Sequence, residues 1–225
     1  MTVLTLFVLW LNISCKTEEP CGCVTPPQTG REFFYPSAKT SIVYDVQQTQ
    51  YALTQSPTTK IYQLKEDATM DSDGTTIRIE RYRRENDTQK WAIDSVFLAK
   101  KEIDKALRTE NNVTFVKLLF PVSEGLKWNG NAYNSLGNDI YELKKLNQSF
   151  QTNGQNFNRT LTVIQQNDST LVDLKRRMEI YAEGIGVIYQ EKTNISYCNS
   201  GDCLGRGKID FGTKYVVKIR SYEIQ

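Results

Sequence analysis

The sequence predicts an all-β protein whose single antiparallel sheet is strongly curved or closed into a barrel, of lipocalin-like or half-barrel shape, with one or two short helices. Three observations support this prediction. Apolar and polar residues alternate along most of the chain after residue 33, turn-forming residues separate the runs, and Thr, Tyr, Val and Ile are frequent. Strands do not alternate with long helical patterns, so a parallel doubly wound sheet is not expected. We expect roughly seven to ten strands, with curvature removing exposed edges.

Four segments carry the clearest strand pattern. Residues 75–79 follow an Asp-Ser-Asp-Gly turn, residues 113–120 end at a proline, and residues 214–224 alternate almost to the end of the chain. A further alternation precedes the polar residues 166–169, which predict a turn.

Two short stretches, residues 100–108 and 139–146, have apolar residues at three- and four-residue spacing and are the predicted helices. Gly184 and Gly186 interrupt a strand pattern, where a bulge or a bend is expected. A phosphate-binding loop is the alternative for these glycines. That motif needs a third glycine and a following helix, and the sequence has neither.

Composition limits the classes of function. The chain of 225 residues is 39% hydrophobic, enough for one good core. Its 28 basic and 26 acidic residues nearly cancel, so nucleic acid is not an expected partner. Histidine is absent, which removes the Ser-His-Asp and Cys-His constellations and the commonest metal ligand. We predict no catalytic residues, no cofactor and no metal centre.

The first residues predict export. Residues 3–11 read VLTLFVLWL, an apolar run that fits an export signal and is too short to span a bilayer, for which a helix needs about 20 residues. Ser14 and Cys15 end a stretch that resembles a lipobox, where a signal peptidase cuts before a cysteine that carries a lipid. Asn12 stands where the motif prefers leucine, and no Lys or Arg precedes the apolar run. The alternative is an ordinary secretory signal cut nearby, with Cys15 left as a thiol or in a disulfide.

Three regions follow from this interpretation. We expect a lipoprotein signal peptide at 1–14, the acylated Cys15 with a flexible tether at 15–32, and a single β domain at 33–225. The tether is rich in Pro, Gly and Thr and has no periodic apolar pattern.

Three stretches resemble uncharacterised lipoproteins of the outer membrane or surface of Bacteroidetes. Residues 16–19, Lys-Thr-Glu-Glu, are similar to the charged export tag that follows the acylated cysteine in many of those proteins. Residues 117–134 (KLLFPVSEGLKWNGNAYN) and 179–189 (EIYAEGIGVIY) are similar to a pair of segments that recurs in the group. The resemblance implies a location in the cell envelope and a fold. It implies no mechanism, because the group has no established activity.

The other four cysteines, Cys21, Cys23, Cys198 and Cys203, are an even number in a chain expected to be exported, which favours disulfides. Cys198 and Cys203 flank a tight-turn sequence that suits a hairpin disulfide. Cys21 and Cys23 are one residue apart, a separation of roughly 7 Å in an extended chain, so a bridge between them would be strained. The alternative is that they pair with Cys198 and Cys203. A four-thiolate zinc site is the metal alternative, with unusual spacing.

Arg81 and Arg83 alternate on the face of two isoleucines and form a candidate anion-binding patch. The more ordinary interpretation is a solvated strand end balanced by nearby glutamates, which we favour. Glu179 and Glu183 are expected on one face of a strand and could serve as a glycosidase pair. Nothing else in the sequence supports hydrolysis.

Trp128, Asn129, Asn131 and Tyr133 lie in a segment that mixes aromatic rings with side-chain amides. Such a mixture could stack on a sugar and bind its hydroxyl groups. The alternative, which we favour, is a loop in which Trp128 packs over a barrel end and the asparagines satisfy turn geometry.

Together these features predict a lipid-anchored protein of a bacterial outer membrane, periplasmic or surface-exposed, acting as a non-enzymatic binding or assembly component. The expected partners are the membrane, through the anchor, and an envelope protein, a glycan or an apolar small molecule. One alternative is a carbohydrate-active enzyme, which needs a cleft with two facing carboxylates about 5 to 10 Å apart. Another is a carrier of lipids or other apolar ligands, which needs an open apolar concavity of about 300 Å³ or more.

Overall fold

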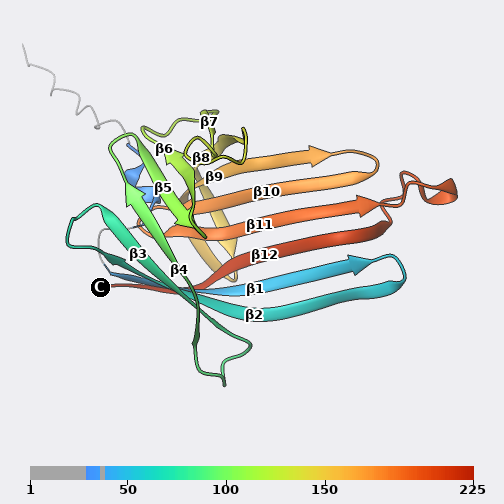
Figure 1. Cartoon of the computed structure of the whole chain (residues 1–225), viewed down its shortest axis with the longest axis horizontal. Helices are drawn as coiled ribbons and strands as arrows, with labels where there is room; N and C mark the ends of the chain where they lie inside the picture. Colours follow the sequence, from blue (N-terminus) through green and yellow to red (C-terminus); the bar gives the residue numbers. More distant parts are fainter. Residues whose placement is uncertain (1–28, 36–38) are drawn as a thin grey trace, which may run out of the picture.

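The computed structural model describes residues 29–35 and 39–225 (Figure 1). In this part of the chain, twelve strands form one antiparallel sheet, and two three-residue 3-10 turns are the only helical elements. The turns are η1 (Arg31–Phe33) and η2 (Gly201–Cys203). The strands are β1 (Thr40–Ala52), β2 (Gln55–Met70), β3 (Thr76–Arg84), β4 (Ala92–Lys101), β5 (Lys105–Glu110), β6 (Val113–Leu119), β7 (Lys127–Asn129), β8 (Ile140–Thr152), β9 (Gln155–Ser169), β10 (Asp173–Ala182), β11 (Gly186–Tyr197) and β12 (Ile209–Ile224). No helix among these residues is long and apolar enough to cross a membrane.

The sheet consists of two meanders, β1 to β6 and β7 to β12, joined where β1 pairs with β12. Its outer strands, β6 and β7, are consecutive in the chain, and they meet. The Val116 N–H donates to the Gly130 carbonyl at 2.8 Å, and the Trp128 indole N–H donates to the Val116 carbonyl at 2.9 Å. The predicted fold class is confirmed: an all-β protein with one antiparallel sheet nearly closed into a barrel.

Several local predictions were wrong. Residues 100–108 and 139–146 form no helix and contribute instead to β4, β5 and β8. Tyr141 and Leu143 are buried at alternate positions of β8, which pairs with β9. An isolated helix of one or two turns would be only marginally stable, so the paired strand is favoured. The turn predicted at 166–169 lies inside β9, and the chain reverses just after it. The sheet also has more strands than expected, because closing the curve uses short strands such as β7.

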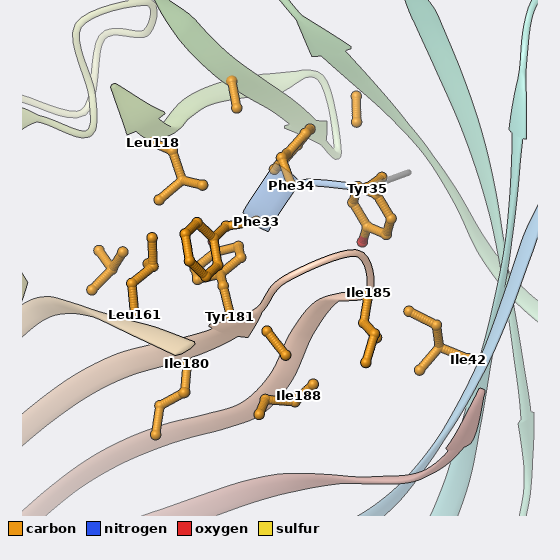
Figure 2. Packing of buried hydrophobic residues seen from close by; sticks show 14 of the residues in the cluster. Phe33, Phe34, Tyr35, Ile42, Leu118, Leu161, Ile180, Tyr181, Ile185 and Ile188 are labelled. Carbon is orange, nitrogen blue, oxygen red and sulfur yellow. The ribbon is translucent and has the colours of Figure 1, made fainter. Parts of the chain in front are cut away.

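An aromatic plug fills the closed part of the barrel. Phe33, Phe34 and Tyr35 are almost fully buried, and Figure 2 shows them within the cluster of buried side chains. Gly30, just before the plug, has φ +79°, and a Cβ there would lie 2.2 Å from a methyl carbon of Val122. Burying each large apolar side chain contributes about 2 kcal/mol. The plug therefore occupies the space where a barrel of this kind could hold a ligand.

The glycines at the end of β10 reverse the chain. Gly184 and Gly186 have φ of +73° and +107° and lie at the turn between β10 and β11. The bend predicted there is thus a complete hairpin connection.

Away from the plug, β1, β2 and β9 to β12 run out to one side as an open extension of the sheet (Figure 1).

Candidate functional site

The open extension places polar residues of six strands in two cross-strand rows. The first row, from β2 to β9, is Lys60, Gln48, Tyr215, Lys192, Arg177 and Gln166. The second row, two residues nearer the hairpin turns, is Thr58, Gln50, Thr213, Asn194, Lys175 and Asp168. Because side chains alternate along a strand, both rows project from one face of the sheet. The next row inward on that face includes the buried Val46 and Val217, so the face continues into the barrel interior.

An open groove of about 640 Å³ lies over these rows. Its lining is Gln48, Gln166, Lys175, Arg177, Lys192, Thr193, Asn194, Thr213 and Tyr215. Although these side chains are polar, most of the surface they present to the groove is carbon. The Tyr215 ring and the aliphatic stems of the lysines supply such surface, since long cationic side chains expose their methylene groups along their length. The groove therefore combines carbon walls with charged and hydrogen-bonding tips.

Two of the three cations in the groove form no ion pair with the residues that the structure describes. Arg177 is neutralised by Asp139, whose two carboxylate oxygens accept hydrogen bonds at 2.8 and 2.9 Å. Lys175 and Lys192 form no ion pair with any residue in the described ranges. Crowding by protein atoms lowers the pKa of the Lys192 ammonium group, and the nearby Glu179 opposes that effect. The Lys192 side chain is nonetheless exposed, so it presents its charge to the groove.

Next to the groove lies a partly enclosed chamber of about 130 Å³, which shares Lys192 and Tyr215 with it. One half of the chamber is organised by Glu66. Its carboxylate accepts hydrogen bonds from Arg108 at 2.8 Å, from Arg81 at 2.5 Å and from the Tyr35 hydroxyl at 2.8 Å. Burial alone raises the pKa of Glu66, but the Arg108 and Arg81 guanidinium groups outweigh it and hold that pKa well below its usual range.

The other half of the chamber is organised by Glu179. Lys117 donates to its carboxylate at 2.5 Å, Gln190 donates at 3.0 Å, and the Tyr181 hydroxyl donates to its second oxygen. Burial raises the pKa of Glu179, and the Lys117 ammonium group more than offsets this, giving a pKa of about 2. Both carboxylates thus stay ionised and paired at neutral pH, which makes them poor general acids.

The carboxylate pair considered for glycoside hydrolysis does not form. Glu179 is buried in β10, whereas Glu183 lies in the following turn and pairs with Arg159. The register of β10 against β11 shifts between Ile180 and Tyr181, and the strand ends at Ala182, so the even spacing does not keep the two glutamates on one face.

The two arginines proposed for an anion patch have internal partners. Arg81 pairs with Glu66 inside the chamber. Arg83 pairs with Glu85 at 2.8 Å and lies over the Tyr62 ring at 3.8 Å from its centroid. The glutamate balance expected for this strand end therefore holds for Arg83, while Arg81 serves the buried network.

The aromatic and amide segment closes the barrel seam. Trp128 is buried, with its indole N–H on the Val116 carbonyl and its ring edge-on to Tyr141 at 5.9 Å. Asn131 is buried and donates to the Gly137 carbonyl at 2.9 Å, while the Asn129 side-chain oxygen accepts from two backbone N–H groups. Tyr133 is exposed, with the Lys105 ammonium group 5.7 Å from the centroid of its ring. These side chains satisfy loop geometry and do not form a sugar-binding platform.

A disulfide joins Cys198 and Cys203, with Cα atoms 5.8 Å apart, in the loop between β11 and β12. Both sulfurs are used, so this pairing leaves neither for Cys21 or Cys23. Those two cysteines and Cys15 lie outside the described residues.

The groove residues were missed in the sequence because they are far apart in it. Lys175 lies in a run of three basic residues, a pattern that is usual on a solvated strand, and Lys192 and Tyr215 stand singly in ordinary strand patterns. The alternation of β10, β11 and β12 is visible, but which residues face each other depends on register, and register depends on bulges such as the one beside Ser196.

No family model and no curated protein matches the chain. A LolA superfamily protein from Nitrosomonas europaea is similar to it at 9% identity and a TM-score of 0.25, covering 87% of this chain and 90% of the other. A domain assigned as an outer-membrane lipoprotein-sorting protein, from Vibrio parahaemolyticus, is similar at 11% identity and a TM-score of 0.24, covering 86% and 88%. Scores this low do not support a conclusion about the function of this chain.

Proposed function

We propose that this protein is a non-enzymatic binding component of a bacterial cell envelope and that its groove holds an anionic amphiphile. The observation that carries the proposal is a pair of lysines that form no ion pair with the described residues, Lys175 and Lys192, on the carbon walls of an open groove of about 640 Å³. Both lysines are exposed to water in the groove, and a ligand that covers them must pair with their charges, because burying an unpaired cation is costly. A purely apolar ligand would leave both lysines unpaired.

The groove suggests how such a ligand lies. Its anionic group pairs with Lys192 and Lys175, which stand on neighbouring strands in adjacent rows. Gln48 and Asn194 supply amide donors for the remaining oxygens of the head group. The alkyl part lies along the Tyr215 ring, where the same face leads toward Val217 and the barrel interior. The plug leaves room for a chain along the groove and not for one inside the barrel.

The envelope part of the proposal rests on separate observations. A disulfide in the β11–β12 loop is typical of proteins that mature in an oxidising compartment. The lipobox-like residues before Cys15 support anchoring through a lipid on that thiol. Labelling with a radioactive fatty acid tests this directly: wild type incorporates label and Cys15→Ala does not. Equal labelling of the two proteins would contradict the anchor.

Calorimetric titration tests the groove. Decyl phosphate, below its micelle concentration, is the probe, and decyl maltoside and inorganic phosphate are the neutral and tailless comparisons. We expect decyl phosphate to bind and the two comparison compounds not to bind. The double variant Lys175→Gln/Lys192→Gln should weaken it by at least about tenfold, because two charge-assisted contacts are lost. Lys214→Gln is the matched control, since Lys214 lies between Thr213 and Tyr215 in β12, so its exposed side chain projects from the opposite face of the sheet.

Four results would contradict this function. Equal affinity for decyl maltoside would mean that charge plays no part, and unchanged binding by the double variant would place the ligand elsewhere. Binding of an acidic oligosaccharide in preference to decyl phosphate would favour a glycan receptor. Hydrolytic turnover of any of these ligands would overturn the non-enzymatic role.

A further inference from the structure

The hairpin tips of the open extension expose large apolar side chains. Leu53 lies in the β1–β2 turn, Leu171 in the β9–β10 turn, and Leu204 and Phe211 in or beside the β11–β12 loop. Each is at least half exposed. Single exposed apolar residues are common on protein surfaces, and their shared position is what distinguishes these four.

All three tips lie at the same end of the sheet. The second groove row contains Gln50, Thr213, Asn194 and Lys175, which are cross-strand neighbours. Leu53 is three residues beyond Gln50, Leu171 is four residues before Lys175, and Phe211 is two residues before Thr213. At about 3.3 Å per residue, these side chains stand within roughly 15 Å of one row. Figure 1 shows the three connections projecting together at the end of the molecule away from β3 to β8.

The β11–β12 loop is held in shape. The disulfide between Cys198 and Cys203 closes it, and the Cys198 N–H donates to the Lys208 carbonyl at 2.8 Å across its base. Leu204 follows directly after the second cysteine and stays exposed. An apolar side chain kept outside on a cross-linked loop has no function in the core.

This end of the molecule is also basic. Residues 46–60, 166–176 and 192–214 contain seven Lys and Arg against four Asp and no Glu, an excess of three. The whole chain has a net charge of only +2, so the positive charge is concentrated here. Basic residues beside exposed apolar ones are the combination that binds anionic lipid surfaces.

We propose that the three hairpin tips dock on an anionic lipid bilayer, with Leu53, Leu171, Leu204 and Phe211 entering the head-group region and the neighbouring basic residues contacting lipid phosphates. A bilayer suits these side chains better than a protein partner. They stand on separate projections with polar residues between them, whereas a protein interface core is a contiguous packed patch. In this orientation the groove opens next to the bilayer. The docking does not depend on what the groove binds.

Site-specific quenching tests the docking. The full chain carrying Cys15→Ser, which removes the thiol proposed to be acylated, is mixed with vesicles of phosphatidylcholine and phosphatidylglycerol whose acyl chains are brominated. Tryptophan is added at the β9–β10 tip by Leu171→Trp, or at a control position by Ile103→Trp, and the parent signal is subtracted. Ile103 is 91% exposed in the β4–β5 turn. That turn lies near the Met70 end of β2, the opposite end from Leu53.

We expect strong quenching of the added tryptophan in Leu171→Trp and little in Ile103→Trp. Adding Leu53→Gln and Leu204→Gln to the Leu171→Trp chain should lower the docking equilibrium constant by about tenfold or more. Vesicles without phosphatidylglycerol, or high salt, should weaken it as well. Equal quenching at the two positions, or no effect of the two glutamines, would overturn the proposal. The same glutamine variants should bind decyl phosphate like wild type. Failure of the docking proposal can therefore be distinguished from failure of the proposed ligand binding in the groove.

Discussion

Replacing Glu179 by glutamine tests the buried ion pair that links β6 of one meander to β10 of the other. Glu179 in β10 and Lys117 in β6 belong to different meanders and lie 2.5 Å apart, with side chains only 4% and 10% exposed. Glutamine keeps the shape of Glu179 and removes its charge, so the Lys117 ammonium group is left buried without a counter-charge. Loss of one partner from a buried pair costs about 3 to 5 kcal/mol.

The double variant Lys117→Met/Glu179→Leu separates the charge from the packing. Replacing both partners with apolar residues of similar size is often neutral, so this protein should regain most of the stability that Glu179→Gln loses. Glu80→Gln is the surface control. Its carboxylate pairs with the exposed Arg78, and an exposed ion pair contributes little.

Urea denaturation followed by circular dichroism measures these differences. A midpoint for Glu179→Gln equal to that of wild type would refute the reasoning. So would a double variant less stable than Glu179→Gln, because uncompensated charge would then not be the cause of the loss.

Three further predictions follow from the same contacts. The pKa of Glu179, about 2 in the folded protein against an ordinary 4.5, means that its stabilisation is complete above pH 4.5 and is lost as pH falls toward 2. Unfolding free energies measured by urea titration should therefore drop by about 3 kcal/mol over that interval from this group, and a flat profile would contradict the pairing. Gly30→Ala should lower the thermal midpoint, because the added Cβ lies 2.2 Å from Val122 beside the plug, whereas Gly154→Ala, with open space and a similar φ of +75°, should show only the backbone part of that loss. Trp128→Phe should lower the unfolding free energy by about 1 kcal/mol, because the hydrogen bond to the Val116 carbonyl is lost. An unchanged free energy would mean that the other contacts hold the β6–β7 seam.

The fold class was predictable because period-two patterning does not depend on register. Strands such as β6 and β12 are visible directly in the alternation of their residues. Closure of the barrel was less visible, since the Val116 to Gly130 contact joins strands that do not pair along their length. The two wrongly predicted helices show the limit of short apolar spacing, because Ala106, Leu107 and Arg108 are all buried in β5, where a register shift breaks the alternation.

The site was predictable only in part. The sequence singles out Glu179 and Arg81 as candidate site residues, but their partners Lys117 and Glu66 come from distant strands, so the sequence does not reveal the buried network. The groove depends on register across six strands, and sequence patterns do not specify register once bulges are present.

Photolabelling tests the groove most directly. An alkyl phosphate with a diazirine in its chain would be bound to the protein, irradiated, and the modified peptides mapped by mass spectrometry. The groove predicts modification on β11 and β12, around Lys192 and Tyr215, and its suppression by excess decyl phosphate. Modification confined to β3 and β4, or label that decyl phosphate does not displace, would contradict it.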